Sequence, residues 1–339
     1  MKRHGIISGG CWLVDHNNTI SHWPTQETLT HIGEREIRGG GPAHNMAIDL
    51  ARLAPGFPVQ AVGVVGDDDA ARLLYATCHE HGVDTQGLRS LPGVATAHTD
   101  VMTVQGTGKR TFFHHQGANA LLAPEDFSFA DSTAKILHLG APGIHARMDR
   151  NDATGENGWV QVLRAARAAG LFTNLEMVSG APEEIHRIAS PCLAHLDSLI
   201  INDYEAEILS GIPLLSGDKT SVQAAGKAAR KLIAAGPLSL VVIHFPLGCV
   251  AATREGALIT RSSLAVPAEA IKGANGAGDA FAAGVLYGWH EAWPLDEALS
   301  LGLCTAAAAL RSLSTTAGVM PVQDCLALAG RWGWRSADE

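Results

Sequence analysis

The residues whose types and spacing are best suited to catalysis or binding lie at 273–279, where a glycine-rich turn is followed directly by a carboxylate. Gly276, Ala277 and Gly278 leave backbone N–H groups uncovered where the positive end of a helix dipole is expected, and an anion should bind there. Asp279 follows at once, so a carboxylate can deprotonate a hydroxyl as that hydroxyl attacks a phosphoryl group. A structural role, with close helix packing and Asp279 as a helix-start charge, explains the local pattern equally well.

Two further motifs place polar groups beside regular structure. Glycines at 39–41 precede Asn45 at the start of an expected helix, so the backbone can approach a ligand while Asn45 offers two donors and an acceptor. Asp15 follows an apolar strand-like segment and can bind sugar hydroxyls or start a turn. Asn202 and Glu205 form a capping-box pattern, and Glu205 can also help to hold a magnesium ion near nucleotide phosphates.

Composition narrows the class of protein. The 339 residues are 46% apolar and 17% charged, which suits one large α/β domain with an appendage. A net charge of -9 without a basic stripe argues against nucleic acid as a partner. The 6 cysteines form no C-x-x-C pair and indicate reduced thiols in a cytoplasmic protein. We expect no secretion signal and no membrane span, because the most apolar segment, 234–252, is interrupted by proline and histidine.

The order of segments predicts the fold. Helix-like patterns at 159–169 and 222–235 each end at a glycine that precedes a strand-like run. Four segments are expected to form parallel strands: 135–139, 171–175, 196–201 and 238–243. This alternation predicts an α/β fold with a doubly wound sheet flanked by helices, and a site at the carboxyl ends of the strands.

Two segments interrupt this alternation and predict a second, small sheet. Residues 11–37 and 96–116 lack helical periodicity and contain alternating stretches. We therefore predict that 1–10, 38–95 and 117–339 form the α/β core with the nucleotide and catalytic site. The small sheet is interpreted as a β lid over that site, and the alternative is an edge sheet without a role in function.

In chain order, these motifs resemble the ribokinase-like (PfkB) family of carbohydrate and nucleoside kinases over nearly the whole chain. The matching motifs are Gly40, Gly41 and Asn45; 63–68; 81–85; 117–119; Asn202 and Glu205; and 276–279. The resemblance implies a core with a β lid, an acceptor bound between them, and ATP with Mg²⁺ as the phosphoryl donor. It also implies a homodimer formed through the lid sheets, because an exposed sheet invites pairing.

The resemblance also implies a role for each matching residue. Asp279 would be the base that takes the proton from the acceptor hydroxyl, with Gly276, Ala277 and Gly278 as the anion hole. Asn202 would contact a phosphate or its water, Glu205 would be linked to magnesium, and Gly248 would lie at the nucleotide. The acceptor would be held by Asp15, Gly40, Gly41 and Asn45.

The identity of the acceptor stays open at this point. A sugar or sugar-like acceptor fits the motifs, and an adenosine-type nucleoside is the alternative. A nucleoside needs an aromatic stacking wall, for which the candidates are Trp12, Trp23 and Phe112. A sugar acid needs an arginine, for which the candidates are Arg89 and Arg110.

Two other classes of function each account for part of the sequence. The 16 histidines suggest a metal hydrolase, but no H-E-x-x-H or comparable ligand spacing occurs. A non-catalytic, sugar-binding descendant of the kinase fold is a better rival, because Pro246 removes an N–H from the expected nucleotide turn. The intact Gly-Ala-Gly-Asp at 276–279 counts against it.

A departure from the family pattern generates a first prediction. Many relatives are activated by K⁺ bound beside the anion hole through an Asp and a Thr, where this chain has Gly273 and Ala274. Without that carboxylate and hydroxyl, backbone carbonyls alone would compete with the hydration shell of the ion. We expect kcat at saturating ATP and Mg²⁺ to change little when a bulky organic cation replaces K⁺ at constant ionic strength. A several-fold loss of kcat would show that other groups, such as Glu269, restore the ion site.

Overall fold

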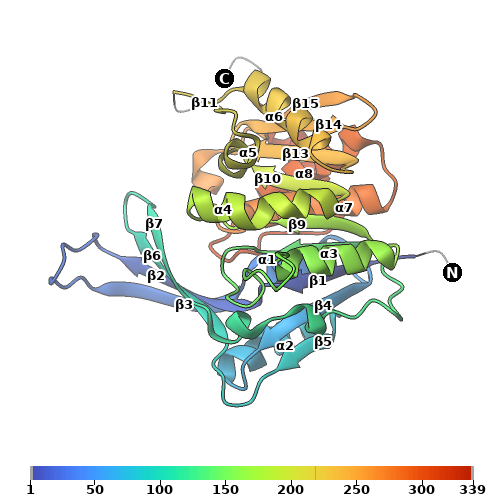
Figure 1. Ribbon diagram of the computed structural model, residues 1–339. Coiled ribbons are helices and arrows are strands. Elements are labelled where there is room, and N and C mark those ends of the chain that lie inside the picture. Colours follow the sequence, from blue (N-terminus) through green and yellow to red (C-terminus); the bar gives the residue numbers. More distant parts are fainter. Residues whose placement is uncertain (1–2, 218, 337–339) are drawn as a thin grey trace.

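A nine-stranded, mostly parallel sheet forms the centre of this computed structural model, which describes residues 3–217 and 219–336 (Figure 1). From edge to edge its strands are β15 (Leu258–Ser262), β14 (Gly248–Thr253), β13 (Leu240–Phe245), β10 (Ser198–Asn202), β9 (Phe172–Glu176), β8 (Ile136–Gly140), β1 (Ile6–Gly10), β4 (Val59–Val65) and β5 (Asp84–Ser90). From β13 to β5 neighbouring strands are parallel, whereas β14 and β15 add an antiparallel edge. The four strands predicted to be parallel are β8, β9, β10 and β13.

Helices cover both faces of this sheet, as a doubly wound fold requires. One core cluster joins the sheet to α1 (Pro42–Leu53), α2 (Asp69–Glu80), α7 (Ala277–His290), α8 (Leu295–Ala309) and α9 (Val322–Trp332). A second joins it to α3 (Gly158–Ala168), α4 (Pro182–Ala189), α5 (Asp203–Ser210) and α6 (Val222–Ala234). In Figure 1 the helices of this second group lie in front of the sheet. The predicted fold class is therefore confirmed.

Local sequence explains where the predicted helices begin. The side chain of Asn157 accepts a hydrogen bond from Val160 N and caps α3, and Ser221 caps α6 in the same way. The buried faces of both helices follow helical spacing, with Trp159, Leu163 and Ala166 buried in α3. The polar segment before α3 is tied by an isolated bridge between Asn151 and Asn157.

Short elements complete the connections. They are the 3-10 helices η1 (Gly117–Leu121), η2 (Pro124–Asp126), η3 (Ser190–His195) and η4 (Ala268–Ala270), and the small hairpin of β11 (Leu215–Ser216) and β12 (Lys219–Thr220). Within residues 3–217 and 219–336, no helix combines the length and the apolar character needed to cross a membrane.

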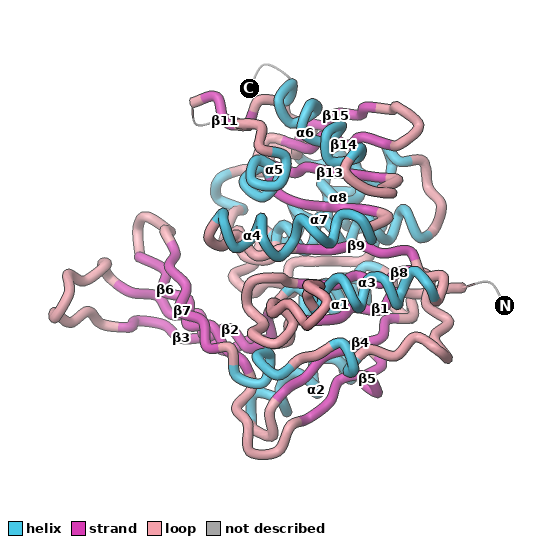
Figure 2. The backbone as a smooth tube through the Cα atoms, in the orientation of Figure 1, coloured by secondary structure: helices cyan, strands magenta, loops and turns pink. Residues whose placement is uncertain are grey.

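The second sheet extends from the side of the molecule as an arm (Figure 2). Its strand order is β3 (Ile32–Gly40), β2 (Leu13–Ile20), β6 (Ala97–Val104) and β7 (Arg110–His115). The small sheet expected from the alternating segments is thus present, and the division of the chain into core and lid stays a prediction. Strand β2 begins directly after β1 ends, so the second sheet leaves the core at the carboxyl ends of the parallel strands.

The carboxyl group of Asp49 is buried in the core without hydrogen bonds, among the described residues, that would compensate for its burial. Asp49, in α1, is fully buried, and neither carboxyl oxygen has a hydrogen-bond partner in the described part of the chain. Burial, followed by the charge of Asp279, holds the pKa of Asp49 well above its usual range. The unfolded chain therefore binds fewer protons at this residue than the folded protein once the pH exceeds the unfolded pKa, and stability falls as pH rises.

This burial generates a prediction on stability. Asp49→Leu keeps the branched shape and removes the unpaired polar group, so the free energy of unfolding at pH 8 should rise by about 1–3 kcal/mol. The gain should shrink toward pH 4, where the unfolded carboxyl also takes up its proton. Urea unfolding at both pH values measures it, with the exposed Asp131→Leu as the control. Equal gains at the two pH values would show that Asp49 does not titrate in this way.

Candidate active site

Asp279 occupies the first turn of α7, whose start is shaped by Gly276. Gly276 is the N-cap at φ 76°, and a Cβ there would lie 2.4 Å from the carbonyl oxygen of Thr315, so only glycine fits. No side chain caps α7, in contrast to α5, which Asn202 caps. Because the first N–H groups of a helix have no acceptor inside it, this end of α7 is open to an anion.

Asn45, from the first turn of α1, holds the Asp279 carboxyl. Its Nδ2 donates to Asp279 Oδ2 at 2.5 Å, and its Oδ1 accepts from Thr315 Oγ1 at 2.9 Å. The second contact fixes which end of the amide faces Asp279. Asn45 was expected beside an acceptor, and the structure places it against the carboxyl of the expected base.

Asp15 and the glycines before α1 meet in the same region. A Cβ on Gly40 would lie 2.2 Å from Asp15 Oδ2 and would displace that carboxyl, and Gly41 adopts φ 88°, which favours glycine. Asp15 is only 7% exposed, and burial, followed by the charge of Asp279, raises its pKa to about 7. The positive charge of Arg110 opposes that shift. The residues predicted to hold the acceptor therefore do come together around Asp279.

Asn202 and Glu205 form the predicted capping box. Asn202 Oδ1 accepts from Glu205 N at 2.9 Å, and Glu205 Oε2 accepts from Asn202 N at 3.1 Å. Glu205 is nevertheless almost completely buried, and its other oxygen accepts from Ser179 Oγ at 3.0 Å. Burial raises its pKa to about 7. The interpretation of Asn202 and Glu205 as a capping box is thus confirmed. Capping alone does not explain why the Glu205 carboxyl is buried beside Asp279.

A cavity of about 160 Å³ brings these groups together with a carboxyl that sequence reasoning missed. Its lining includes Glu176, Glu205 and Asp279. Glu176 is the last residue of β9, and burial raises its pKa to about 7. The position of Glu176 at the carboxyl end of a predicted parallel strand was the available signal, because ligands in such sheets bind at these ends.

A larger cavity of about 390 Å³ adjoins the first one and has a different character. The two share Asn202, His244 and Gly278 in their linings. The larger cavity extends between the turn after β13 and helices α7 and α8, and its apolar wall includes Val266, Phe281 and Leu310. An apolar slot that opens onto a helix N-terminus can take a planar base at one end and phosphates at the other.

The turn after β13 lines this cavity through Pro246 and Gly248. A Cβ on Gly248 would lie 2.1 Å from the carbonyl oxygen of Arg261, so this glycine is needed by the strand pairing itself. Pro246 contributes its carbonyl oxygen to a hydrogen bond from Ser263 Oγ at 2.9 Å. The predicted nucleotide turn therefore faces the cavity. The presence of glycine at position 248 is explained by the strand pairing alone.

A third cavity, of about 730 Å³, lies between the second sheet and the loop at 271–275. Arg110 lines it, whereas Arg89 pairs with Asp126 elsewhere. Trp12 is fully buried, with its indole N–H donating to Val62 O at 3.0 Å, so it cannot stack on a ligand. Trp23 stacks on Phe113 in the second sheet. Of the candidates for the acceptor, Arg110 lines this cavity, and Phe112, two residues farther along the same strand, is exposed.

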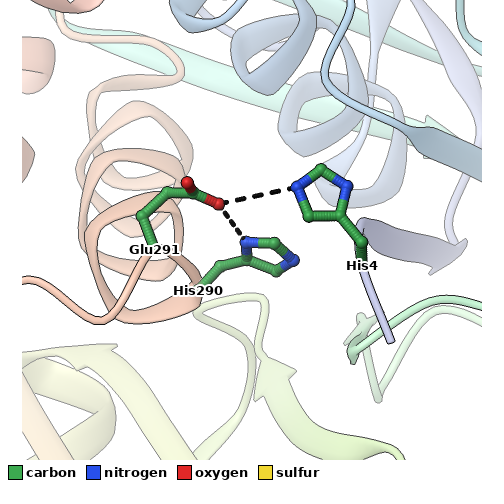
Figure 3. Close-up of side chains that lie close together, drawn as sticks. All are labelled: His4, His290 and Glu291. Carbon is green, nitrogen blue, oxygen red and sulfur yellow. Dashed lines mark hydrogen bonds and ion pairs between the residues drawn. The ribbon is translucent and has the colours of Figure 1, made fainter. Parts of the chain in front are cut away.

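A group of possible metal ligands lies at the other end of α7 (Figure 3). His4, His290 and Glu291 bring their ligand atoms within 4.8 Å of one another. His290 Nε2 accepts from the backbone N–H of Gly5 at 2.8 Å, so its proton sits on Nδ1, 2.6 Å from Glu291 Oε1. Both ring nitrogens are therefore in use, and the group fastens the start of β1 to the end of α7.

Solved structures share this architecture. Ribokinase from Thermotoga maritima superimposes with a TM-score of 0.77 at 19% identity, covering 96% of this chain and 99% of that one. Arabidopsis thaliana ribokinase, solved with ribose and ATP, gives a TM-score of 0.76 at 21% identity over 96% and 98% of the two chains. At these identities the likeness shows the fold, with its α/β core and second small sheet.

Sequence comparison shows the family. A family model described as pfkB family carbohydrate kinase matches residues 11–322, and the chain belongs to this family. A 5-dehydro-2-deoxygluconokinase from Shouchella clausii is 24% identical over an aligned length of 336 residues, and the match covers 96% of this chain and 96% of the relative. A protein named probable fructokinase-3 from Arabidopsis thaliana is 28% identical over 225 residues, and that match covers 64% of this chain and 61% of the relative.

Proposed function

We propose that this protein is an ATP-dependent carbohydrate kinase that transfers the γ-phosphoryl group to a hydroxyl of a sugar or sugar-like acceptor. The observation that carries the proposal is the placement of Asp279 at the uncapped start of α7, beside Asp15 and Asn45 and next to the cavity suited to a nucleotide. The kinase names of the relatives support it. The other features expected from the family resemblance, a cytoplasmic location among them, are proposals of the same kind.

The residues of this chain account for the transfer step. Asp279 takes the proton of the acceptor hydroxyl as its oxygen attacks the γ-phosphorus, while the bond from that phosphorus to the bridging oxygen of ADP breaks. Asp15 and Asn45 orient the acceptor, which keeps the hydroxyl oxygen in line with the phosphorus. Charge that develops on the transferring phosphoryl group is stabilised by the backbone N–H groups at Gly276, Ala277 and Gly278.

The donor groups near the 160 Å³ cavity suit Mg²⁺. They are carboxylate and amide oxygens, the hard ligands that this ion prefers, and one Glu176 oxygen is buried without a hydrogen bond among the described residues. Glu205, with Asn202 beside it, is the residue that we assign to holding the ion or its waters. When bound, Mg²⁺ would neutralise part of the phosphate charge.

The acceptor can be identified by testing a panel of candidate acceptors. ATP turnover should be measured with fructose, ribose, 5-dehydro-2-deoxygluconate and adenosine, because Arg110 suits a carboxylate and the exposed Phe112 suits a base. Turnover with a sugar or sugar acid supports the proposal. Turnover with adenosine alone identifies a nucleoside kinase, and binding of sugars without turnover identifies a non-catalytic descendant.

We also propose a homodimer formed through the second sheet. The large apolar side chains of Ile32, Ile37 and Phe113 are each about half exposed on its strands. Exposed apolar groups on one sheet favour burial against a second copy of that sheet. In this arrangement each second sheet would be held over its own cavity by the partner.

The role of Asp279 generates a direct prediction. Asp279→Asn keeps the size of the side chain but removes its capacity to accept a proton, so kcat should fall by roughly 10²-fold to 10⁴-fold. The KM for the acceptor should change little. Asp15→Asn is the comparison, and it should act mainly on the KM. Near-normal turnover by the Asp279→Asn protein would remove Asp279 from the chemistry.

The two roles of Glu205 can be separated. Glu205→Gln should raise the Mg²⁺ concentration that gives half-maximal activity several-fold, because one charged oxygen ligand is lost. The melting temperature should hardly fall, since Gln also serves at this capping position. Exposed Glu184→Gln, on the neighbouring α4, is the control. An unchanged Mg²⁺ titration would leave capping as the whole role of Glu205.

A further inference from the structure

The segment that connects α8 to α9, residues 310–321, lies between two parts of the site, and none of the motifs identified in the sequence falls in it. Its start is held against the chain that leads into the anion hole, because Lys272 N donates to Leu310 O at 2.8 Å. Its far end is held by α1, whose last-turn Arg52 donates to Val319 O at 2.9 Å. The α8–α9 segment therefore joins α1 to the chain that precedes α7.

Thr315, in the middle of this segment, contacts both parts of the site. It is only 3% exposed, and its backbone carbonyl oxygen and Cα occupy the space that a side chain at Gly276 would need. Its hydroxyl group donates to Asn45 Oδ1 at 2.9 Å, and Gly39 O is a more distant acceptor at 3.4 Å. Thr315 thus contacts the anion-hole turn through its backbone and the start of α1 through its hydroxyl group.

The hydroxyl group of Thr315 favours one orientation of the Asn45 amide. A hydroxyl group has one proton to donate, and Asn45 Oδ1 is the closer of its two acceptors. With Oδ1 held in this way, Nδ2 is directed at Asp279 Oδ2, to which it donates at 2.5 Å. His44 Nδ1 makes a longer contact of 3.2 Å with the same Oδ1. A rotated amide would instead turn Oδ1 toward the carboxylate, where two acceptors repel each other.

We propose that Thr315 is a positioning residue for the transfer step. Its hydroxyl group fixes the Asn45 amide, and the amide fixes the direction in which the Asp279 carboxylate meets the acceptor hydroxyl. Proton transfer requires hydrogen-bond distance and alignment between the base and the hydroxyl, so a carboxylate that is free to turn reacts more slowly. In this role Thr315 acts through Asn45 and not on the reacting atoms. The inference rests on the proposed role of Asp279 as the base.

Removal of the hydroxyl group tests this role. Thr315→Val keeps the shape of the side chain, and kcat should fall about tenfold, which is the effect expected from the loss of one hydrogen bond. The KM for ATP should change by less than about twofold, because the anion-hole turn contacts the backbone of Thr315 and not its hydroxyl group. Thr315→Ser keeps the hydroxyl group and should retain most of the wild-type kcat.

A double-mutant cycle shows whether Thr315 acts through Asn45. In an Asn45→Ala background there is no amide to orient, so Thr315→Val should lower kcat by less than about twofold. A role limited to the packing of the segment would lower kcat by the same factor in both backgrounds. Thr316→Val is the matched control, because Thr316 is also buried and no hydrogen bond joins its hydroxyl group to α1 among the residues that the structure describes. Equal losses in the two backgrounds, or a Thr315→Ser protein as slow as Thr315→Val, would contradict the inference.

A second measurement is independent of turnover. The side-chain amide protons of Asn45, assigned in NMR spectra by their absence in Asn45→Ala, should exchange with water roughly tenfold faster in Thr315→Val than in the wild type or Thr315→Ser, because one contact of the amide is lost. If Thr315→Val does not fold, Thr315→Ala removes the same hydroxyl group and takes its place. If the wild-type protein phosphorylates no acceptor, the proposed function fails, while the exchange rates still decide whether Thr315 holds Asn45. An unchanged exchange rate overturns the inference.

Discussion

The site is organised by the repulsion between carboxyl groups that share a poorly solvated space. Asp15, Glu176, Glu205 and Asp279 all approach one region at the carboxyl ends of the strands, and burial disfavours the charged form of each. Such a group is stable only when protons or cations offset the charge. The surrounding structure offsets this repulsion, because it supplies fixed hydrogen-bond donors and uncapped helix starts.

Helix starts provide much of that compensation. Both α1 and α7 begin at a glycine with positive φ and without a side-chain cap. Their N-terminal dipoles therefore face the acidic region, where they attenuate its negative charge. Asn45 adds an amide donor to the same place. Gly276 and Gly41 thus each serve two purposes: they allow the positive backbone angle φ, and they leave the N–H groups at the helix start uncovered.

The sequence alone was enough to predict the main strands and helices and several of the polar residues that line the site. The strands and helices follow from periodicity, and Asp279 and the Asn202–Glu205 pair are local patterns that can be recognised without coordinates. Glu176 and Thr315 could not be ranked in this way. Their roles depend on the register between β8 and β9 and on the packing of residues distant in the chain against the start of α1. Register and long-range packing are properties of the assembled sheet, which a local pattern does not encode.

The covalent path from the second sheet into the core has a mechanical consequence. Strand β3 ends at Gly40, α1 begins at Pro42, and Asn45 lies in its first turn. The connection from this edge of the arm to the residue that contacts Asp279 is therefore only a few residues long. Asp15, on the paired strand β2, packs closely against Gly40. A displacement of the arm would therefore be transmitted through Gly40 and Gly41 to Asn45, and from Asn45 to the Asp279 carboxyl that it contacts.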